Sequence, residues 1–77
     1  MRTAVFKSYK NGYYTFIFET GEDMVFEEIH PKVLYKYNLK SDPSFIDKQF
    51  QLTFSEVIED TDEDFVIYRI ENLKLLS

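Results

Sequence analysis

The chain has 77 residues, no cysteine and a formal net charge of −5, and 18% of its residues are aromatic. A chain of this length buries a small core, and without cysteine it can hold neither a disulfide nor a thiolate metal site. We therefore expect a single domain over residues 1–77 whose core depends on its eight Phe and six Tyr side chains.

Composition also bears on location and on partners. Small secreted domains usually need disulfides, so the absence of cysteine favours the cytoplasm. The first residues show no signal peptide pattern, and no apolar run approaches the roughly 20 residues of a membrane span. An acidic chain repels phosphate backbones at long range, which argues against generic nucleic-acid binding.

Three strand-like runs come first in the chain. Residues 2–9 and 13–20 flank Asn11-Gly12, a pair typical of a type I′ hairpin turn, because both central positions of that turn need positive φ. A second turn over residues 20–23 leads to a third run over residues 24–29. The order predicts a three-stranded antiparallel meander.

A short helix is expected next. Pro31 suits the first turn of a helix, where its missing N–H has no partner to lose. Val33, Leu34 and Tyr37 then form an apolar stripe of about two turns. The pattern predicts a helix over about residues 31–38.

Two more strands complete the chain. Residues 49–55 alternate apolar and polar side chains, and residues 65–73 form a last apolar run after the acidic stretch 59–64. Three strands, a helix and two strands predict an all-β domain, a five-stranded barrel of OB type that the helix caps at one end. An SH3-like or split five-stranded barrel is the alternative.

Two stretches resemble the cold-shock domain family. Residues 12–17 (GYYTFI) and 24–29 (MVFEEI) stand where that family has Lys-Gly-Phe-Gly-Phe-Ile and Asp-Val-Phe-Val-His-Phe, and residues 47–54 are similar to its fourth strand. The resemblance implies an OB-type barrel with an outward platform that stacks the bases of single-stranded nucleic acid. The platform positions correspond here to Tyr14, Phe16, Phe26 and Glu28.

The match to the family has clear departures. Gly12 replaces the family's Lys, Glu28 replaces its His, and Tyr13 and Thr15 replace both motif glycines. Glu27 stands where the family has an inward Val, so either it lies at the rim or the register slips by one residue. A one-residue slip would exchange the two faces of the strand.

The aromatic side chains define the candidate binding site. Both faces of the second run read as apolar, so one of them must be exposed unless another element covers it. We expect an outward aromatic face that binds a partner, with two basic side chains beside it, or alternatively that these rings form the core. The expected binding residues are Tyr14, Phe16, Phe18, Phe26, Lys7 and Lys10.

No catalytic or cofactor site is predicted. His30, the only imidazole, has no recognisable nucleophile partner in the sequence and is expected to enter the helix as a polar residue. The spacing of Asp60, Asp62, Asp64 and Glu71 matches calcium-loop ligands, but the pattern lacks the required Gly and its flanks alternate like strands. We expect a solvated turn there, and no metal.

Lysines on the helix are a further candidate feature. Lys32, Lys36 and Lys40 recur at every fourth position and, together with the first hairpin, could form a local positive stripe. The alternative is an ordinary solvated helix face.

Two functions follow as expectations. The first is a non-enzymatic protein-interaction module, including self-association, that uses the outward aromatic face. The second is a divergent cold-shock-type binder of single-stranded nucleic acid that stacks bases on Tyr14, Phe16 and Phe26.

Overall fold

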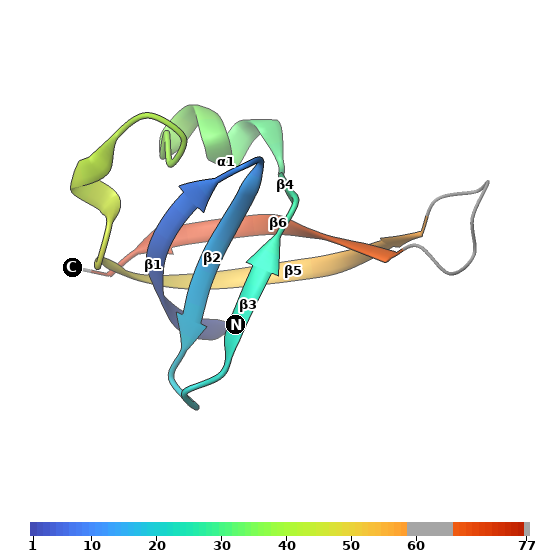
Figure 1. Ribbon diagram of the computed structural model, residues 1–77, viewed down its shortest axis with the longest axis horizontal. Helices are drawn as coiled ribbons and strands as arrows, with labels where there is room; N and C mark the ends of the chain where they lie inside the picture. The colour runs from blue at the N-terminus through green and yellow to red at the C-terminus, as the bar shows by residue number, and fades with distance from the viewer. Residues whose placement is uncertain (59–65, 77) are drawn as a thin grey trace.

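The computed structural model describes residues 1–58 and 66–76, which form six strands, one α-helix and one 3₁₀ helix (Figure 1). In chain order the elements are β1 (Arg2–Lys10), β2 (Tyr13–Phe18), β3 (Asp23–Phe26), β4 (Glu28–Ile29), α1 (Pro31–Lys36), the 3₁₀ helix η1 (Pro43–Phe45), β5 (Gln49–Ile58) and β6 (Val66–Leu75). The predicted all-β class with one short α-helix is confirmed.

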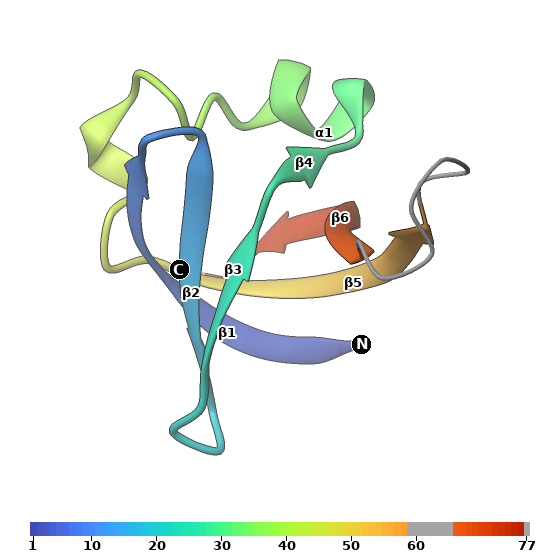
Figure 2. The same cartoon turned by 45° about the vertical axis from the view of Figure 1, so that its right-hand side comes forward.

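The described strands form one sheet in the order β3-β2-β1-β5-β6-β4. The β1–β2, β2–β3, β1–β5 and β5–β6 pairs are antiparallel, whereas β4 pairs with β6 in parallel. The predicted meander of the first three strands is therefore confirmed. The two ends of the sheet, β3 and β4, are consecutive in the chain (Figure 2).

The predicted five-stranded closed barrel is not what the strand pairing shows. The run expected to be the third strand divides at Glu27 into β3 and β4, and within residues 1–58 and 66–76 no ladder joins β3 to β4 or to β6. The Glu27 N–H donates to the Tyr68 carbonyl at 3.2 Å, so the chain changes partner from β2 to β6 at this residue. A change of partner ends one ladder and begins another.

Turn residues explain the first hairpin and the start of the helix. Asn11 and Gly12 both have positive φ, at 53° and 85°, as a type I′ turn requires. His30 precedes α1 as its N-cap, and its Nδ1 accepts a hydrogen bond from the Lys32 N–H at 3.2 Å. The expected place of His30 at the helix entry is thus confirmed.

The helix ends two residues earlier than predicted. Tyr37 leaves helical geometry with φ −128° and ψ 99°. Its hydroxyl accepts a hydrogen bond from the Leu75 N–H, and its ring packs edge-on against Phe45 and Phe50. These tertiary contacts draw Tyr37 toward the sheet, whereas a continued helix would keep it on the stripe of Val33.

The core lies on the inner face of the curved sheet. Phe16 stands at its centre, with ring centroids 5.2 Å from Phe6, 5.7 Å from Phe26 and 6.2 Å from Phe50. The buried members of the cluster are Ala4, Phe6, Tyr14, Phe16, Phe18, Phe26, Val33, Leu39, Phe50, Leu52, Ile70 and Leu73. Among the described residues, no helix is long and apolar enough to cross a membrane.

Candidate interaction surface

The four expected platform rings lie in the core. Tyr14, Phe16, Phe18 and Phe26 expose 3%, 0%, 3% and 0% of their surface. Their predicted outward placement is therefore wrong, and the alternative, that these rings form the core, is confirmed. The physical reason is the register, because Phe16 lies opposite Phe6 and Tyr14 opposite Phe26, so all four rings share the face on which the first strand buries its own apolar residues.

The opposite face of the meander carries the exposed apolar side chains. Tyr13, Ile17 and Val25 expose 46%, 37% and 43% of their surface, and the half-buried Val5 and Thr15 lie beside them. Val5 is directly opposite Ile17, and Thr15 is directly opposite Val25, so these side chains are cross-strand neighbours. We call these five residues, Val5, Tyr13, Thr15, Ile17 and Val25, the outer patch.

Carboxylates border the outer patch on the β3 side. Asp23 lies opposite Ile17 and is exposed, and Glu27 follows Val25 at the next outward position. Among the described residues neither carboxylate has an ion-pair partner. Glu19 and Glu22 add two exposed carboxylates in the turn between β2 and β3.

The basic residues expected beside the site are placed differently. Lys7 is exposed and forms an ion pair with Asp47, which partly neutralises it. Lys10 is exposed at the end of β1, opposite Tyr13. The four expected rings are buried in the core, whereas both lysines are exposed, so the expected grouping of these lysines with an outward aromatic face does not form.

The predicted lysine stripe is interrupted. The helix ends at Lys36, whose Nζ lies 5.3 Å from the centroid of the Tyr37 ring. Lys40 lies beyond the helix, with its Nζ 6.0 Å from the centroid of the Tyr9 ring. The three lysines therefore do not continue along one helix face.

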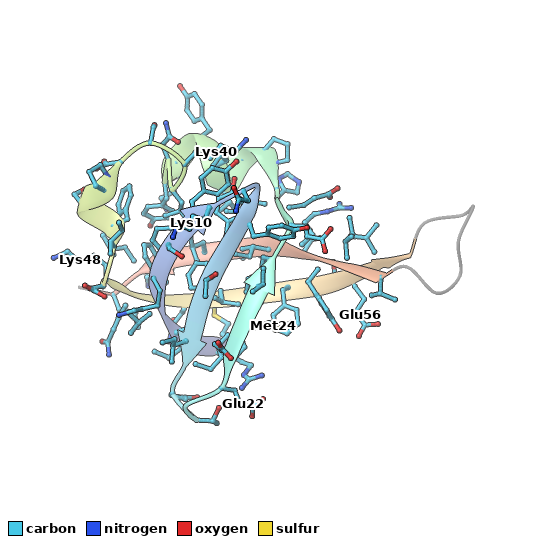
Figure 3. All side chains as sticks on the ribbon, viewed as in Figure 1. Lys10, Glu22, Met24, Lys40, Lys48 and Glu56 are labelled. Atoms are coloured by element: carbon cyan, nitrogen blue, oxygen red, sulfur yellow. The ribbon has the colours of Figure 1, made fainter. Side chains whose placement is uncertain are left out.

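The formal charge differs between the described residues and the segment 59–64. Of the 14 acidic side chains, five lie at positions 59–64, so the described residues hold nine acidic and nine basic side chains. In Figure 3, Lys10, Lys40 and Lys48 lie on the upper and left side of the molecule, Glu22 lies at the bottom and Glu56 at the right. The net charge of −5 thus equals the charge of the segment 59–64, and the formal charges of the described residues sum to zero.

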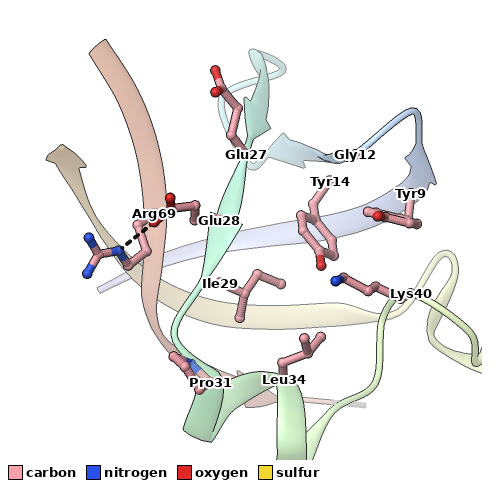
Figure 4. A pocket seen from close by; sticks show the side chains of 10 residues that line it. All are labelled: Tyr9, Gly12, Tyr14, Glu27, Glu28, Ile29, Pro31, Leu34, Lys40 and Arg69. Atoms are coloured by element: carbon pink, nitrogen blue, oxygen red, sulfur yellow. Dashed lines mark hydrogen bonds and ion pairs between the residues drawn. The ribbon is translucent and has the colours of Figure 1, made fainter. Parts of the chain in front are cut away.

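An open pocket of about 580 Å³ lies where the first hairpin, the β3–β4 junction and α1 meet. In Figure 4 the Tyr14 ring and the Lys40 ammonium point into it beside Ile29 and Leu34, whereas Glu27 points away. Arg69, on the far side, donates to Glu28 at 3.1 Å. The pocket therefore combines a phenol, a cation and apolar walls.

Burial controls the chemistry of the Tyr14 hydroxyl. Removal from water, with a smaller contribution from the neighbouring Tyr9, raises the pKa of Tyr14 to about 12. The two rings lie 4.6 Å apart. At neutral pH the phenol therefore stays protonated and can act as a hydrogen-bonding group, but its high pKa makes it a poor general acid or base.

Other candidate chemistry is limited in the described part of the chain. Within it, no group of three or more His, Asp or Glu side chains is arranged to hold a metal ion. Glu71 accepts a hydrogen bond from Ser55 and lies 3.8 Å from Arg69. Asp60, Asp62 and Asp64, the other members of the calcium-loop pattern, lie outside the described residues.

Sequence reasoning missed the outer patch as a site because both faces of β2 read as apolar. A usable signal was present in β3, where Asp23, Val25 and Glu27 alternate with Met24 and Phe26. Carboxylates avoid the core, so this alternation assigns Val25 to the outside.

No protein-family model matches the chain, and comparisons with curated proteins and with solved structures gave no match.

Proposed function

We propose that the chain is a non-enzymatic protein-interaction module that binds a protein partner through the outer patch. The observation that carries the proposal is the exposure of Tyr13, Ile17 and Val25 on one continuous sheet face. Grouped apolar side chains on a surface are typical of interaction sites, whereas single ones are ordinary. Tyr13 is the kind of side chain that anchors interfaces, because its ring is apolar and its hydroxyl can hydrogen-bond.

The charge on the β3 side of the patch favours a basic partner, whereas Lys10 lies on the β1 side, opposite Tyr13. Asp23 and Glu27 have no ion-pair partner within the described residues, and both border the apolar side chains. A partner with cations around an apolar contact would neutralise them and would be steered toward this side of the molecule. The partner that we propose is therefore a protein surface that combines Lys or Arg with apolar residues.

The nucleic-acid alternative lacks its stacking platform. Phe16 and Phe26 are fully buried and Tyr14 is 3% exposed, so none of these rings can take a base on its face in this conformation. Base stacking on aromatic rings supplies much of the affinity of such binders. Nucleic-acid binding is therefore kept as an outcome to be tested rather than as the proposal.

We also infer that the strand order is that of an OB-type domain of the cytoplasm. Support comes from β3 and β4, which together occupy the expected third strand and pair with β2 at one end and with β6 at the other. Read as one strand bent at Glu27, they form both ends of the sheet. The cold-shock resemblance is consistent with that order, and the lack of cysteine supports the cytoplasm.

A display selection tests the proposed function. A library of peptides and small domains is selected against the wild-type chain, and the enriched ligands are measured against Ile17→Asp and against the control Ile46→Asp. Both residues are exposed, but Ile46 lies outside the patch. We expect Ile17→Asp to weaken binding by at least about tenfold, as interface anchors do, and Ile46→Asp to leave it unchanged. Equal binding to all three proteins, or no enriched ligand, would contradict the proposal.

A further inference from the structure

The geometry points to strand addition at the edge of β3 as the way in which a partner is bound. We propose that β3 pairs with an extended peptide segment that alternates basic and apolar side chains. This inference rests on the proposed function, because it specifies the partner and the binding mode of the same face of the molecule. Extended peptides that join an exposed sheet edge gain affinity from backbone hydrogen bonds and specificity from alternate side chains.

Backbone hydrogen bonds establish which groups of β3 face β2. The Phe18 N–H donates to the Glu22 carbonyl at 2.7 Å, so the backbone N–H and C=O groups of Glu22 point toward β2. In an antiparallel strand, alternate residues direct both backbone groups to the same side. The backbone groups of Met24 and Phe26, which are opposite Phe16 and Tyr14, therefore also point toward β2.

The intervening residues face the other edge. By the same alternation, the N–H and C=O groups of Asp23 and Val25 point away from β2. Glu27, the next residue in this series, agrees, because its N–H donates to Tyr68 on that side. In the described part of the chain no strand pairs with β3 beyond this bond, since β3 is the end strand of the sheet. The N–H and C=O groups of Asp23 and Val25, four in all, have no backbone partner among the described residues and are the groups that an added strand would pair with, whereas at Glu27 the edge is already taken by β6.

Side chains on the same stretch define the chemistry of the segment. Asp23, Val25 and Glu27 stand at alternate, outward positions, so an acidic, an apolar and an acidic side chain follow one another along the edge. A matching strand places Lys or Arg opposite Asp23 and Val or Ile opposite Val25. A further Lys or Arg two residues on would approach the Glu27 carboxylate through its side chain, because the Glu27 backbone N–H is already bonded to Tyr68. Oppositely charged cross-strand pairs stabilise such a ladder.

The same pattern argues against a second copy of this chain as the occupant. An antiparallel pair of β3 strands centred on Val25 would place Asp23 opposite Glu27 in both halves. Like charges directly opposite one another destabilise a strand pair. A basic, extended segment of another protein is therefore the occupant that charge complementarity selects.

Titration with a synthetic probe tests the inference. The probe is the blocked peptide Thr-Lys-Thr-Val-Thr-Lys-Thr, and its control has Glu in place of both Lys. The uniformly ¹⁵N-labelled protein is followed by NMR. We expect the basic probe to bind with a Kd of about 1 mM or below, to shift the amides of Asp23 and Val25 and to slow their hydrogen exchange. The acidic control should bind at least about tenfold more weakly. Absence of binding by the basic probe, or equal binding of both peptides, would overturn the inference.

A backbone variant separates edge pairing from contact with the face. Val25→Pro removes an N–H that faces the open edge and leaves the bonds to β2 intact, which is where an edge strand accepts proline. Val25→Thr is the matched control that keeps the N–H. We expect Val25→Pro to weaken probe binding at least about tenfold and Val25→Thr to weaken it less.

A modified probe tests strand addition on the wild-type protein, so the result does not depend on whether Val25→Pro folds. The probe with N-methyl groups on the residues that face β3 should lose binding to the wild-type protein. Unchanged binding of this probe would overturn strand addition. If the ligands from the display selection still depended on Ile17, the proposed function would stand while the edge inference failed. If the probe bound the edge but the selected ligands bound Ile17→Asp as tightly as the wild-type protein, the outer patch would not be their binding face, and strand addition would stand as a property of the β3 edge alone.

Discussion

At the residue scale, the division between core and surface depends on which face of the sheet each β2 side chain occupies. Tyr14, Phe16 and Phe18 alternate with Tyr13, Thr15 and Ile17, and either set could line a core. The register with β3 resolves the choice, because Asp23 is directly opposite Ile17. A carboxylate is stable only outside, so Ile17 lies outside with it and the large rings fill the core.

This orientation predicts opposite costs for neighbouring truncations. Phe16→Ala removes a fully buried ring that contacts three other Phe rings, so it should lower the free energy of unfolding by about 3–5 kcal/mol. Ile17→Ala, the matched control at an exposed position, should change it by less than about 1 kcal/mol. Urea unfolding checks both values, and similar losses for the two variants would contradict the orientation.

The raised pKa of Tyr14 predicts a loss of stability at alkaline pH. The phenol has a pKa of about 10 in an unfolded chain, and burial raises it to about 12 in the folded state. Below the lower value both states are protonated, so this group adds no pH dependence. Between the two values only the unfolded state loses the proton, so the free energy of unfolding should fall as pH rises.

Urea unfolding at several alkaline pH values measures this effect, and Tyr14→Phe is the control. The variant cannot ionise at this position, so its stability should fall less steeply over the same interval. Parallel curves for the two proteins would show that Tyr14 is not shielded as described.

At the element scale, local signals predicted the elements and tertiary contacts set their limits. The turn at Asn11-Gly12, the meander and the Pro31 helix start were all predictable from residue types. The division of the third strand at Glu27 and the early end of α1 were not. Both depend on partners distant in the sequence, the Tyr68 carbonyl for Glu27 and the Leu75 N–H for Tyr37.

The candidate site was predicted only in part, for a similar reason. Sequence pattern indicated that one face of the meander must be exposed, and the structure has such a face. Which face it is depends on strand register, which a period of two alone does not determine. The expected binding site therefore placed the four aromatic residues on the exposed side, whereas the alternative that they form the core is the correct one, and Tyr13 and Ile17 belong to the outer patch.

The first hairpin turn provides a test at this scale. Gly12 has φ of 85°, and a Cβ at this position would meet no atom within 4 Å. Gly12→Ala should therefore destabilise the protein through backbone strain alone, by about 1–2 kcal/mol. Gly12→Asn should cost less, because Asn tolerates positive φ. Thermal unfolding compares the variants, and an unchanged Tm for Gly12→Ala would contradict the turn geometry.

At the scale of the whole molecule, charge is distributed unevenly rather than simply negative. The described residues hold equal numbers of acidic and basic side chains, with the carboxylates of Glu22 and Asp23 at one end of the meander and with both lysines and the carboxylates of Asp42 and Asp47 near η1. Recognition of the proposed partner would therefore depend on local charge. The acidic stretch 59–64 adds a long-range repulsion toward phosphate backbones.

Nucleic-acid binding is predicted to be weak. Titration with labelled oligo(dT) and oligo(U) at low salt should give a Kd no tighter than about 1 mM, because the stacking rings are buried and the net charge is −5. Tighter binding that weakened as salt rose would contradict this expectation and would favour the cold-shock-type function.

The central claim is that the outer patch is the binding face, and amide shift mapping with a ligand from the display selection tests it most directly. The account predicts that the largest shifts fall on residues 13–17 and 23–27, on the exposed side of β2 and β3. Shifts confined to residues 30–40, around α1 and its following loop, would contradict it.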